Sequence, residues 1–357
     1  MKWQLFNAGI IVGATFLFSA IIMIFIKKIA FHINAVDVPR SEEGNRHIHK
    51  KTTPKLGAVG IFLAFLFGYM LFGEQSVKMN SILIGSFIII LTGIIDDINP
   101  IKAGQKLIGH IAAALVIVFY GGILLNNISA FGYQIDFGLM AYPFTLLFIV
   151  ACTNIINLID GMDGLSGGIC AIFFFTIAAL SFYQGRYGSL VLILCLIMFG
   201  STLGFLWHNF YPATIFAGDC ATFMGFMISV ITLLEFKGPA LIGFFVPLTI
   251  IGIPILDTLF AIIRRLLKGE PPFKADRQHL HHQLLGMNFS HRTTVLIIYA
   301  INILFASASM FYTMVDQKIG QIIYIIIFIL VIWFVLHTSI ITDKTKELKI
   351  NNKRKDM

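Results

Sequence analysis

The chain has 357 residues, of which 57% are hydrophobic and only 12% are charged, and its formal net charge at pH 7 is +8. A soluble domain usually carries about a quarter charged residues. A water-soluble fold has no place for 35 phenylalanines and so much other apolar surface. Composition therefore excludes a soluble globular protein and predicts an integral membrane protein.

Apolar runs long enough to cross a bilayer recur along the chain, since a helix needs about 20 apolar residues to cross the hydrocarbon. We predict about eleven spans, near residues 6–28, 56–73, 79–95, 105–124, 141–158, 166–183, 188–207, 214–234, 239–266, 293–314 and 319–340. The first run is too long for the apolar core of a signal peptide. The eighth begins in a polar motif, where a merged or re-entrant segment is the alternative. The expected fold class is an all-α polytopic transmembrane helical bundle over residues 1–341, followed by a basic tail at 342–357.

Positive residues divide unevenly between the two ends of these spans. If the N-terminus lies outside, only five of the 26 lysines and arginines fall on the outer side: Lys2, Lys78, Arg186, Lys237 and Lys318. Because positive residues favour the cytoplasm, we expect the N-terminus outside and the C-terminus in the cytoplasm. The basic tail is then a topology determinant that touches anionic lipid, and the net charge does not predict a nucleic-acid partner.

Five polar segments interrupt the apolar pattern, and each follows an odd-numbered predicted span. They cover residues 45–54, 96–100, 154–165, 208–219 and 274–282. The orientation deduced from charge places all five on the cytoplasmic side. Charge bias and motif placement are independent observations, so their agreement predicts a functional site on that face.

Carboxylates in these segments stand at the ends of hydrophobic helices: Asp96, Asp97, Asp160, Asp163 and Asp219. Ionisable residues near the hydrocarbon are costly, which favours a functional site. Adjacent carboxylates repel one another, and a divalent cation would offset that repulsion. Mg²⁺, which binds through a few carboxylates plus phosphate oxygens, is the expected cofactor, with Mn²⁺ as the alternative. The plainer interpretation is that these acids are helix-end residues that extend into the headgroups, and it applies best to Asp163, because Asp is common at helix starts.

Histidines concentrate in the last polar segment, where His279, His281 and His282 lie beside Arg277. A zinc site is disfavoured because no cysteine is near and the basic neighbours would repel a cation. An anion-binding loop fits better, since arginine offers a planar fork for phosphate and histidine adds donors. A basic loop facing a carboxylate cluster is what a substrate pyrophosphate with Mg²⁺ requires. Asp257, in the ninth run, either reaches this site or pairs with the arginines that follow it.

Together these motifs resemble the polyprenyl-phosphate N-acetylhexosamine-1-phosphate transferases. The resemblance runs from about residue 37 to residue 292 and rests on five separated motifs in the right order. It implies Mg²⁺-dependent transfer of a sugar-1-phosphate from a UDP-sugar to undecaprenyl phosphate, with release of UMP, in a bacterial plasma membrane. The histidine segment is similar to the UDP-GlcNAc branch, so the phospho-MurNAc-pentapeptide transferase of peptidoglycan synthesis is the alternative.

The resemblance also implies roles for individual residues. The expected catalytic residues are Asp96, Asp97, Asp160, His279, His281 and His282. The expected substrate-binding residues are Asn157, Asp163, Asn209, Phe216, Arg277, His49 and Lys50. The expected metal ligands are Asp219 and Asn157. By position, the pair Asp96–Asp97 would activate the lipid phosphate, and Phe216 would stack on uracil.

A proton-coupled transporter is the main rival class, because such carriers also hold acids and histidines within their spans. Here the acids cluster at one face, and no internal repeat is visible. The expected partners are UDP-GlcNAc, undecaprenyl phosphate and membrane lipids, with a homodimer as a further expectation. The reaction would begin a cell-envelope glycopolymer such as teichoic acid.

Overall fold

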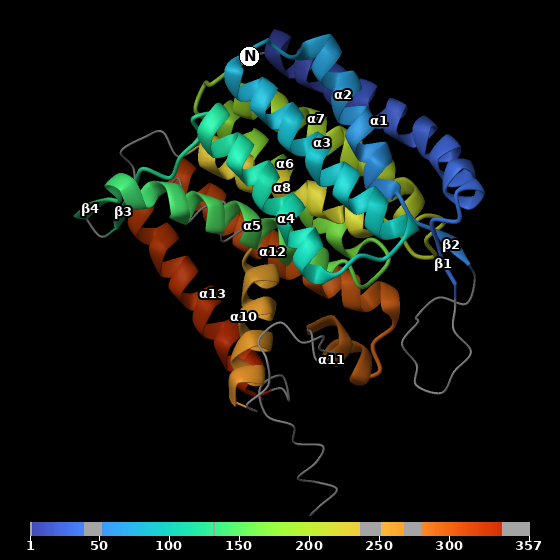
Figure 1. Cartoon of the computed structure of the whole chain (residues 1–357). Coiled ribbons are helices and arrows are strands. Elements are labelled where there is room, and N and C mark those ends of the chain that lie inside the picture. Colours follow the sequence, from blue (N-terminus) through green and yellow to red (C-terminus); the bar gives the residue numbers. More distant parts are fainter. Residues whose placement is uncertain (1, 39–51, 131–132, 236–250, 268–279, 338–357) are drawn as a thin grey trace, which may run out of the picture. The chain divides into compact units, whose positions relative to one another are not determined.

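The computed structural model describes residues 2–38, 52–130, 133–235, 251–267 and 280–337 (Figure 1). The chain divides into two compact units, residues 1–251 and residues 252–357. Helices make up most of both units, as the sequence predicts for a membrane bundle. The predicted boundary between bundle and tail, at residue 341, lies outside the described residues.

The first unit contains eight α-helices within its described part. Their bounds are α1 Lys2–His32, α2 Gly57–Phe72, α3 Val77–Ile98, α4 Ala103–Leu115, α5 Ala141–Ile159, α6 Leu165–Tyr183, α7 Leu190–Asn209 and α8 Thr222–Glu235. A π-helical turn, Val116–Tyr120, continues α4, and short 3-10 turns, Gly138–Met140 and Asp219–Ala221, precede α5 and α8. The described part of the second unit contains α10 Gly252–Leu267, α11 Leu280–Gly286, α12 His291–Met314 and α13 Gln317–His337.

Seven helical segments in the described chain are long and apolar enough to cross a membrane. They are Gln4–His32, Val77–Ile98, Ala103–Tyr120, Gly138–Ile159, Leu165–Tyr183, Leu190–Asn209 and His291–Met314. The polytopic membrane class is thus confirmed, whereas the count of eleven spans and the orientation stay predictions. The predicted start of the eighth span, at residue 214, is wrong, because α8 begins at Thr222. The polar motif before it forms a loop and a 3-10 turn instead of helix.

Two short antiparallel ladders accompany the helices, which the all-helical prediction did not include. The first pairs β1, Val36–Asp37, with β2, Thr53–Pro54. The second pairs β3, Asn127–Ala130, with β4, Tyr133–Asp136. Hydropathy patterns detect spans of about 20 residues, so pairings of two to four residues in the connecting loops escape them.

Serine caps set where two of the long helices begin. The side chain of Ser76 accepts a hydrogen bond from the Met79 amide at the start of α3, at 3.1 Å. Ser189 does the same for the Leu192 amide at the start of α7, at 3.2 Å. Each cap satisfies one of the amides that the first turn of a helix leaves without an intrahelical partner.

The helices of the first unit alternate in direction, which brings four polar segments to one end. Residues 33–38 with 52–56, 99–102, 160–164 and 210–221 each join two helices there, and we call this the polar-loop end. Hydrogen bonds between the segments confirm the placement. Asp163 Oδ2 accepts from the Ala213 amide at 2.9 Å, and Asn209 Oδ1 accepts from the Gly164 amide at 2.9 Å.

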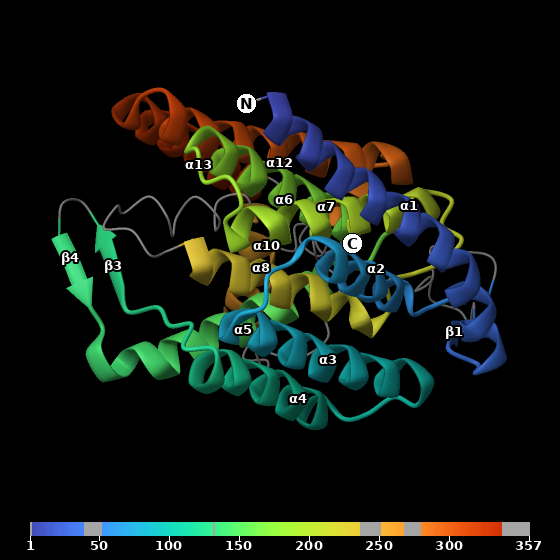
Figure 2. The same ribbon diagram turned by 90° about the horizontal axis from the view of Figure 1, so that it is seen from above.

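Helix α8 forms the core of the first unit, because every residue from Thr222 to Leu234 is buried. Helix α5 packs on it, and α3, α6 and α7 also contact it. Helices α3 and α4 lie side by side, and α1 runs along α7 (Figure 2). The site described below lies at the polar-loop end of this helix core.

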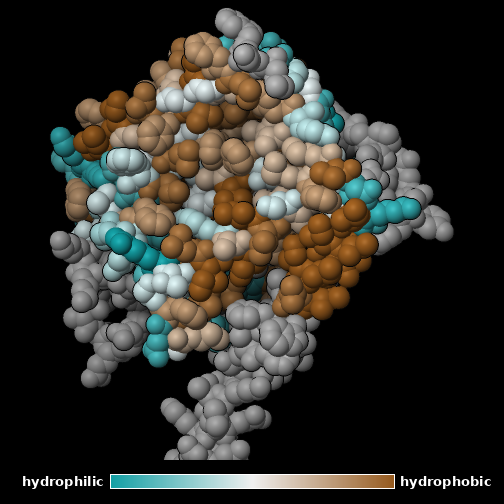
Figure 3. All heavy atoms as spheres, turned by 180° about the vertical axis from the view of Figure 1, so that it is seen from behind, coloured by the Kyte–Doolittle hydropathy of each residue, from teal (hydrophilic) through white to brown (hydrophobic). Residues whose placement is uncertain are grey.

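The outer surface is largely apolar, as a bilayer requires. Figure 3 shows that hydrophobic residues cover much of the visible face, with scattered hydrophilic groups among them. Phe87 and Leu91 on α3 and Ile108 on α4 are among the exposed large hydrophobic side chains. In water such a surface would drive aggregation, whereas in lipid it has no such effect.

The contact between α1 and α7 depends on small residues. A Cβ atom on Gly204 would lie 2.5 Å from Ser19 Cβ and 2.6 Å from the Phe16 carbonyl oxygen. Ser19 Oγ donates to the Ser201 carbonyl at 2.7 Å across the same seam. Small residues at helix crossings let backbones approach closely, which is how membrane helices gain packing energy.

Replacing Gly204 by alanine should therefore lower the apparent melting temperature in detergent. The added methyl group overpacks the α1–α7 seam, at a cost of about 1 to 3 kcal/mol. Gly13→Ala is the matched control, because a Cβ at Gly13 meets nothing within 4 Å. It should leave the melting temperature unchanged or raise it, since alanine favours helix over glycine. Equal melting temperatures for the two variants would contradict this account.

Candidate active site

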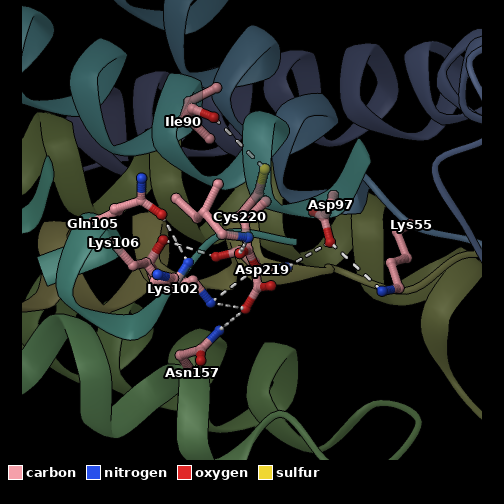
Figure 4. A network of polar contacts seen from close by, with 12 residues as sticks. Lys55, Ile90, Asp97, Lys102, Gln105, Lys106, Asn157, Asp219 and Cys220 are labelled. Carbon is pink, nitrogen blue, oxygen red and sulfur yellow. Dashed lines mark hydrogen bonds and ion pairs between the residues drawn. The ribbon is translucent and has the colours of Figure 1, made fainter. Parts of the chain in front are cut away.

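Carboxylates from two elements converge on the ammonium group of Lys106 at the polar-loop end. Lys106, on α4, places its Nζ 2.6 Å from Asp219 Oδ1 (Figure 4). The same Nζ lies 3.0 Å from Asp96 Oδ2. Asp96 comes from the last turns of α3, and Asp219 opens the 3-10 turn before α8. The amide of Ile101 donates to Asp96 Oδ1 at 2.9 Å, which fixes that carboxylate against the α3–α4 loop.

Asp97, the second acid of the pair, faces a different partner. Its Oδ1 accepts the backbone amide of Asp219 at 3.0 Å, and its side chain has no exposed surface. Lys55 approaches the same oxygen only at 3.9 Å. Asp97 therefore holds the chain at Asp219 in place. This geometry favours a positioning role for Asp97 over the activation of the lipid phosphate that the resemblance implies.

The segment that carries Asp219 lies unusually close to α3, and glycines permit the approach. Gly218 has φ +72°, and a Cβ there would lie 2.3 Å from Asp97 Oδ2. A Cβ on Gly93 of α3 would lie 2.8 Å from Cys220 Cα. Positive φ is readily available only to glycine, so Gly218 is required by both its backbone conformation and its surroundings. The Cys220 thiol lies 3.8 Å from the Ile90 carbonyl oxygen in the same contact.

Helix α5 contributes the amide of Asn157, whose Nδ2 donates to Asp219 Oδ1 at 3.2 Å. Asp160 follows the end of the helix, and its Oδ1 accepts a hydrogen bond from Ser166. Burial raises the pKa of Asp160 to about 7, the Ser166 hydroxyl opposes that shift, and the charges of Asp219 and Asp163 add to it. A carboxyl group in such surroundings is stabilised in its charged form when a cation is near.

The nucleotide-binding candidates Asp163, Asn209 and Phe216 also gather at the polar-loop end, but they bond chiefly to the backbone. Asn209 is buried, with Oδ1 accepting from the Gly164 amide and Nδ2 donating to the Ile215 carbonyl, both at 2.9 Å. The Phe216 amide donates to the Pro54 carbonyl at 2.9 Å. Asn209 thus shapes the loop, and its contact with a substrate stays a prediction.

Most of the predicted histidine segment is not described. Arg277 and His279 lie outside the described residues, as do His49 and Lys50, and the side chain of His282 is likewise outside them. His281, which belongs to the second unit, is buried. The Leu280 amide, at the start of α11, donates to Asp257 Oδ1 at 2.8 Å. Asp257 therefore bonds to the backbone beside the histidines within its own unit.

Lys106 and Lys55 were missed by the sequence reasoning. Lys106 lies inside the predicted span 105–124, where a charge is as costly as the carboxylates that were noticed. The presence of a charged residue inside a predicted span could therefore have identified Lys106 as a candidate site residue. Lys55, next to Pro54 in a polar loop, carried no such signal. Ser166, which bonds Asp160, is one of many serines in apolar helices and was not separable from packing residues.

The donor chemistry of the site suits a hard divalent cation. Among the described residues, no group of three or more His, Cys, Asp or Glu side chains converges as a metal site. Two carboxylates do converge, however, and the Asp219 side chain is 26% exposed. Mg²⁺ needs only one or two carboxylates when phosphate oxygens complete its shell. The residues present therefore fit Mg²⁺ bound together with a phosphate-bearing substrate, through Asp219 and the amide oxygen of Asn157.

Comparison with known proteins points to one family. The sequence profile described as glycosyl transferase family 4 matches residues 79–235, which run from α3 to α8. The chain is 38% identical to the probable undecaprenyl-phosphate N-acetylglucosaminyl 1-phosphate transferase of Bacillus subtilis, over 91% of this chain and 90% of that protein. It is 31% identical to the decaprenyl-phosphate N-acetylglucosaminephosphotransferase of Mycobacterium tuberculosis H37Rv, over 77% of this chain and 74% of that one. It is 27% identical to the undecaprenyl-phosphate alpha-N-acetylglucosaminyl 1-phosphate transferase of Escherichia coli K12, over 82% of this chain and 80% of that protein.

Replacing Asn209 by alanine should lower the free energy of unfolding by about 2 to 4 kcal/mol, because two buried backbone groups lose their partners. These are the Gly164 amide and the Ile215 carbonyl. Thermal or denaturant unfolding in detergent measures the change. Asn80→Ala, at an exposed position on α3, is the control and should unfold like the parent protein. An Asn209→Ala protein of parental stability would show that the loop does not depend on this side chain.

Proposed function

The chain belongs to glycosyl transferase family 4, and we propose that it transfers GlcNAc-1-phosphate from UDP-GlcNAc to undecaprenyl phosphate with release of UMP. The observation that carries the proposal is the convergence of Asp96, Asp219 and Lys106 where apolar helices end. A water-soluble nucleotide sugar and a lipid phosphate in the bilayer can meet only at such a boundary. The names of the related proteins support the two substrates.

The reaction joins two anions. An oxygen of the lipid phosphate forms a bond to the β-phosphorus of UDP-GlcNAc, and the bond from that phosphorus to the bridging oxygen breaks, leaving UMP. The lipid phosphate is already ionised near neutral pH, so the protein has to position the reactants and offset their repulsion. Bound Mg²⁺ would supply charge neutralisation for the pyrophosphate and the leaving UMP.

The residues of this chain have separable tasks in that scheme. Lys106 contributes positive charge beside the carboxylates and can contact phosphate oxygens, since its side chain is 21% exposed. Asp219 and Asn157 are the candidates for holding the metal. Asp97 keeps the Asp219 segment against α3 through its amide hydrogen bond. Asp163 binds the Ala213 amide and so shapes the loop in which Phe216 lies, and Phe216 is the candidate for stacking on uracil.

The finer expectations from the sequence belong to the same proposal. The charge bias of the loops supports an active site that faces the cytoplasm of a bacterial cell. The histidine segment, with His279, His281 and His282, is the candidate for binding the sugar phosphate. Initiation of a cell-envelope glycopolymer, with teichoic acid as the example, and assembly as a homodimer remain proposals.

Purified protein in detergent, with undecaprenyl phosphate and Mg²⁺, should release UMP from UDP-GlcNAc and not from UDP-MurNAc-pentapeptide. Chromatographic quantification of UMP over time measures this directly. Release from the pentapeptide substrate instead would overturn the assignment to the GlcNAc branch. Release from neither substrate, with the lipid and the metal verified, would refute the proposed reaction.

Asp219→Asn should reduce UMP release by more than about 100-fold, the size of effect seen when a preorganised electrostatic contact is lost. The variant keeps the shape of the side chain, and Lys106 keeps its ion pair with Asp96, so the protein should remain folded. Asp136→Asn, an exposed acid in the connection between α4 and α5, is the control and should retain full activity.

Metal dependence provides the complementary test. Removal of divalent cations with EDTA should abolish UMP release by the parent protein, and added Mg²⁺ should restore it, with Mn²⁺ as the second metal to try. A well-folded Asp219→Asn protein with near-parental activity, or full activity in EDTA, would show that the metal assignment is wrong.

A further inference from the structure

A closed set of polar contacts links α1, α7 and the loop that follows α7. Lys27 Nζ lies 2.9 Å from His208 Nδ1 and 2.5 Å from Thr214 Oγ1. His208 Nε2 lies 2.9 Å from the Ala20 carbonyl oxygen. The two ring nitrogens of His208 thus each contact a residue of α1. The Thr214 hydroxyl and amide both donate to the His208 carbonyl, at 2.9 Å and 2.8 Å. The proposed reaction assigns no task to these residues.

With Lys27 in its charged form, one protonation state of His208 satisfies all of its partners. A carbonyl oxygen can only accept, so the nitrogen that faces Ala20, Nε2, must carry a proton. An ammonium group can only donate, so the nitrogen that faces Lys27, Nδ1, must offer its lone pair. His208 is therefore a neutral imidazole, and the positive charge of this cluster belongs to Lys27. Every contact in the set then has one donor and one acceptor.

Lys27 uses its charge in an unusual way for a lysine at the end of a membrane helix. Such lysines commonly extend along the surface so that the ammonium group reaches the headgroups. Lys27 is half-buried, and its two acceptors are neutral. No carboxylate in the part of the chain that the structure describes forms an ion pair with it. The neighbouring Lys28 is exposed and offers a direct comparison within one helix.

Thr214 lies between the two parts of the loop that the proposed function needs. On one side is Ala213, whose amide binds Asp163, and on the other is Ile215, whose carbonyl binds Asn209. Phe216 follows directly and is tied to the first polar loop through its own backbone. Asp163, in the loop between α5 and α6, and Asn209, at the end of α7, hold the loop from one side, and Lys27 of α1 holds its exposed side.

We propose that Lys27 is a positioning residue that fixes loop 210–217 for binding of the uridine nucleotide, acting through His208 and Thr214. The proposal rests on the proposed function, because it assumes that this loop receives the nucleotide. A hydrogen bond from a charged donor is stronger than one between neutral groups. An ammonium group that binds both His208, at the end of α7, and Thr214, in the loop, can therefore order the loop at little further entropic cost. Free movement of the loop would weaken nucleotide binding without removing any group that touches the reacting phosphates.

Kinetics of UMP release test the proposal with Lys27→Met and Lys28→Met as a matched pair. Lys27→Met should raise the KM for UDP-GlcNAc about tenfold and leave kcat within about twofold, which is the pattern for loss of uniform substrate binding. Lys28→Met removes an equal charge at the same membrane depth and should change neither constant. Equal effects of the two variants would mean that charge near the headgroups matters and that positioning does not, which would overturn the proposal.

A double-mutant cycle with Thr214→Val isolates the contact. Thr214→Val should raise KM by itself, and the double variant with Lys27→Met should be little worse than either single variant, since both remove the same interaction. Lys27→Arg, which keeps the charge and the donors, should restore much of the affinity. Fully additive effects, or no recovery with arginine, would count against the contact.

Hydrogen–deuterium exchange of residues 208–217 tests the same contact without any substrate. Lys27→Met should make these amides exchange faster than in the parent protein, and Lys28→Met should not. Faster exchange in a protein that releases no UMP from UDP-GlcNAc would leave Lys27 as the residue that orders the loop and would refute only the proposed function. Unchanged exchange in Lys27→Met would refute the positioning role whatever the activity.

Discussion

The contact of Lys106 with Asp96 and Asp219 is the interaction on which the polar-loop end depends. Acids at the boundary of the hydrocarbon are stable only when their charge is offset, because removing an unpaired charge from water costs several kcal/mol. Lys106 supplies that compensation from α4, at 2.6 Å and 3.0 Å from the two carboxylates. The contact also fixes the ends of α3 and α4 relative to the turn that opens α8. Substrate and metal would thus meet a site whose charges are already arranged.

The membrane class and the placement of polar segments at one end were predictable, because both follow from local sequence. An apolar run of about 20 residues crosses a bilayer as a helix. Successive spans run in opposite directions, so every second loop lies at the same end of the bundle. The convergence of Asp96, Asn157 and Asp219 followed from that alternation and is confirmed by their contacts within the first unit. The start of α8 was misplaced because the residues before it are apolar enough to continue a span, although they form a loop that binds other loops.

The different contacts of Asp96 and Asp97 were not predictable from the sequence. Asp96 and Asp97 are neighbours, so on a helix their side chains point about 100° apart. The sequence does not say which one faces the cation and which one faces the backbone of another segment. Asn209 gave the same difficulty. An amide side chain in a polar segment is typical of a ligand contact, yet the oxygen and the nitrogen of this amide both bind backbone groups. Lys106 and Lys27 reach partners 113 and 187 residues away, distances at which no local pattern operates.

The hydrogen bond from the Asp219 amide to Asp97 has a consequence for mutational scanning. Truncating Asp97 would displace the backbone of Asp219, which it holds through the amide. The Asp97 variant would therefore show the same loss of function as a variant truncated at Asp219. A scan that scores growth or turnover would place both acids in one class, although only one of them has a side chain open to solvent. Loss of function on mutation of a residue at the polar-loop end therefore does not distinguish a structural role from a chemical one. Isosteric amide variants, which keep an acceptor for the Asp219 amide, separate the two.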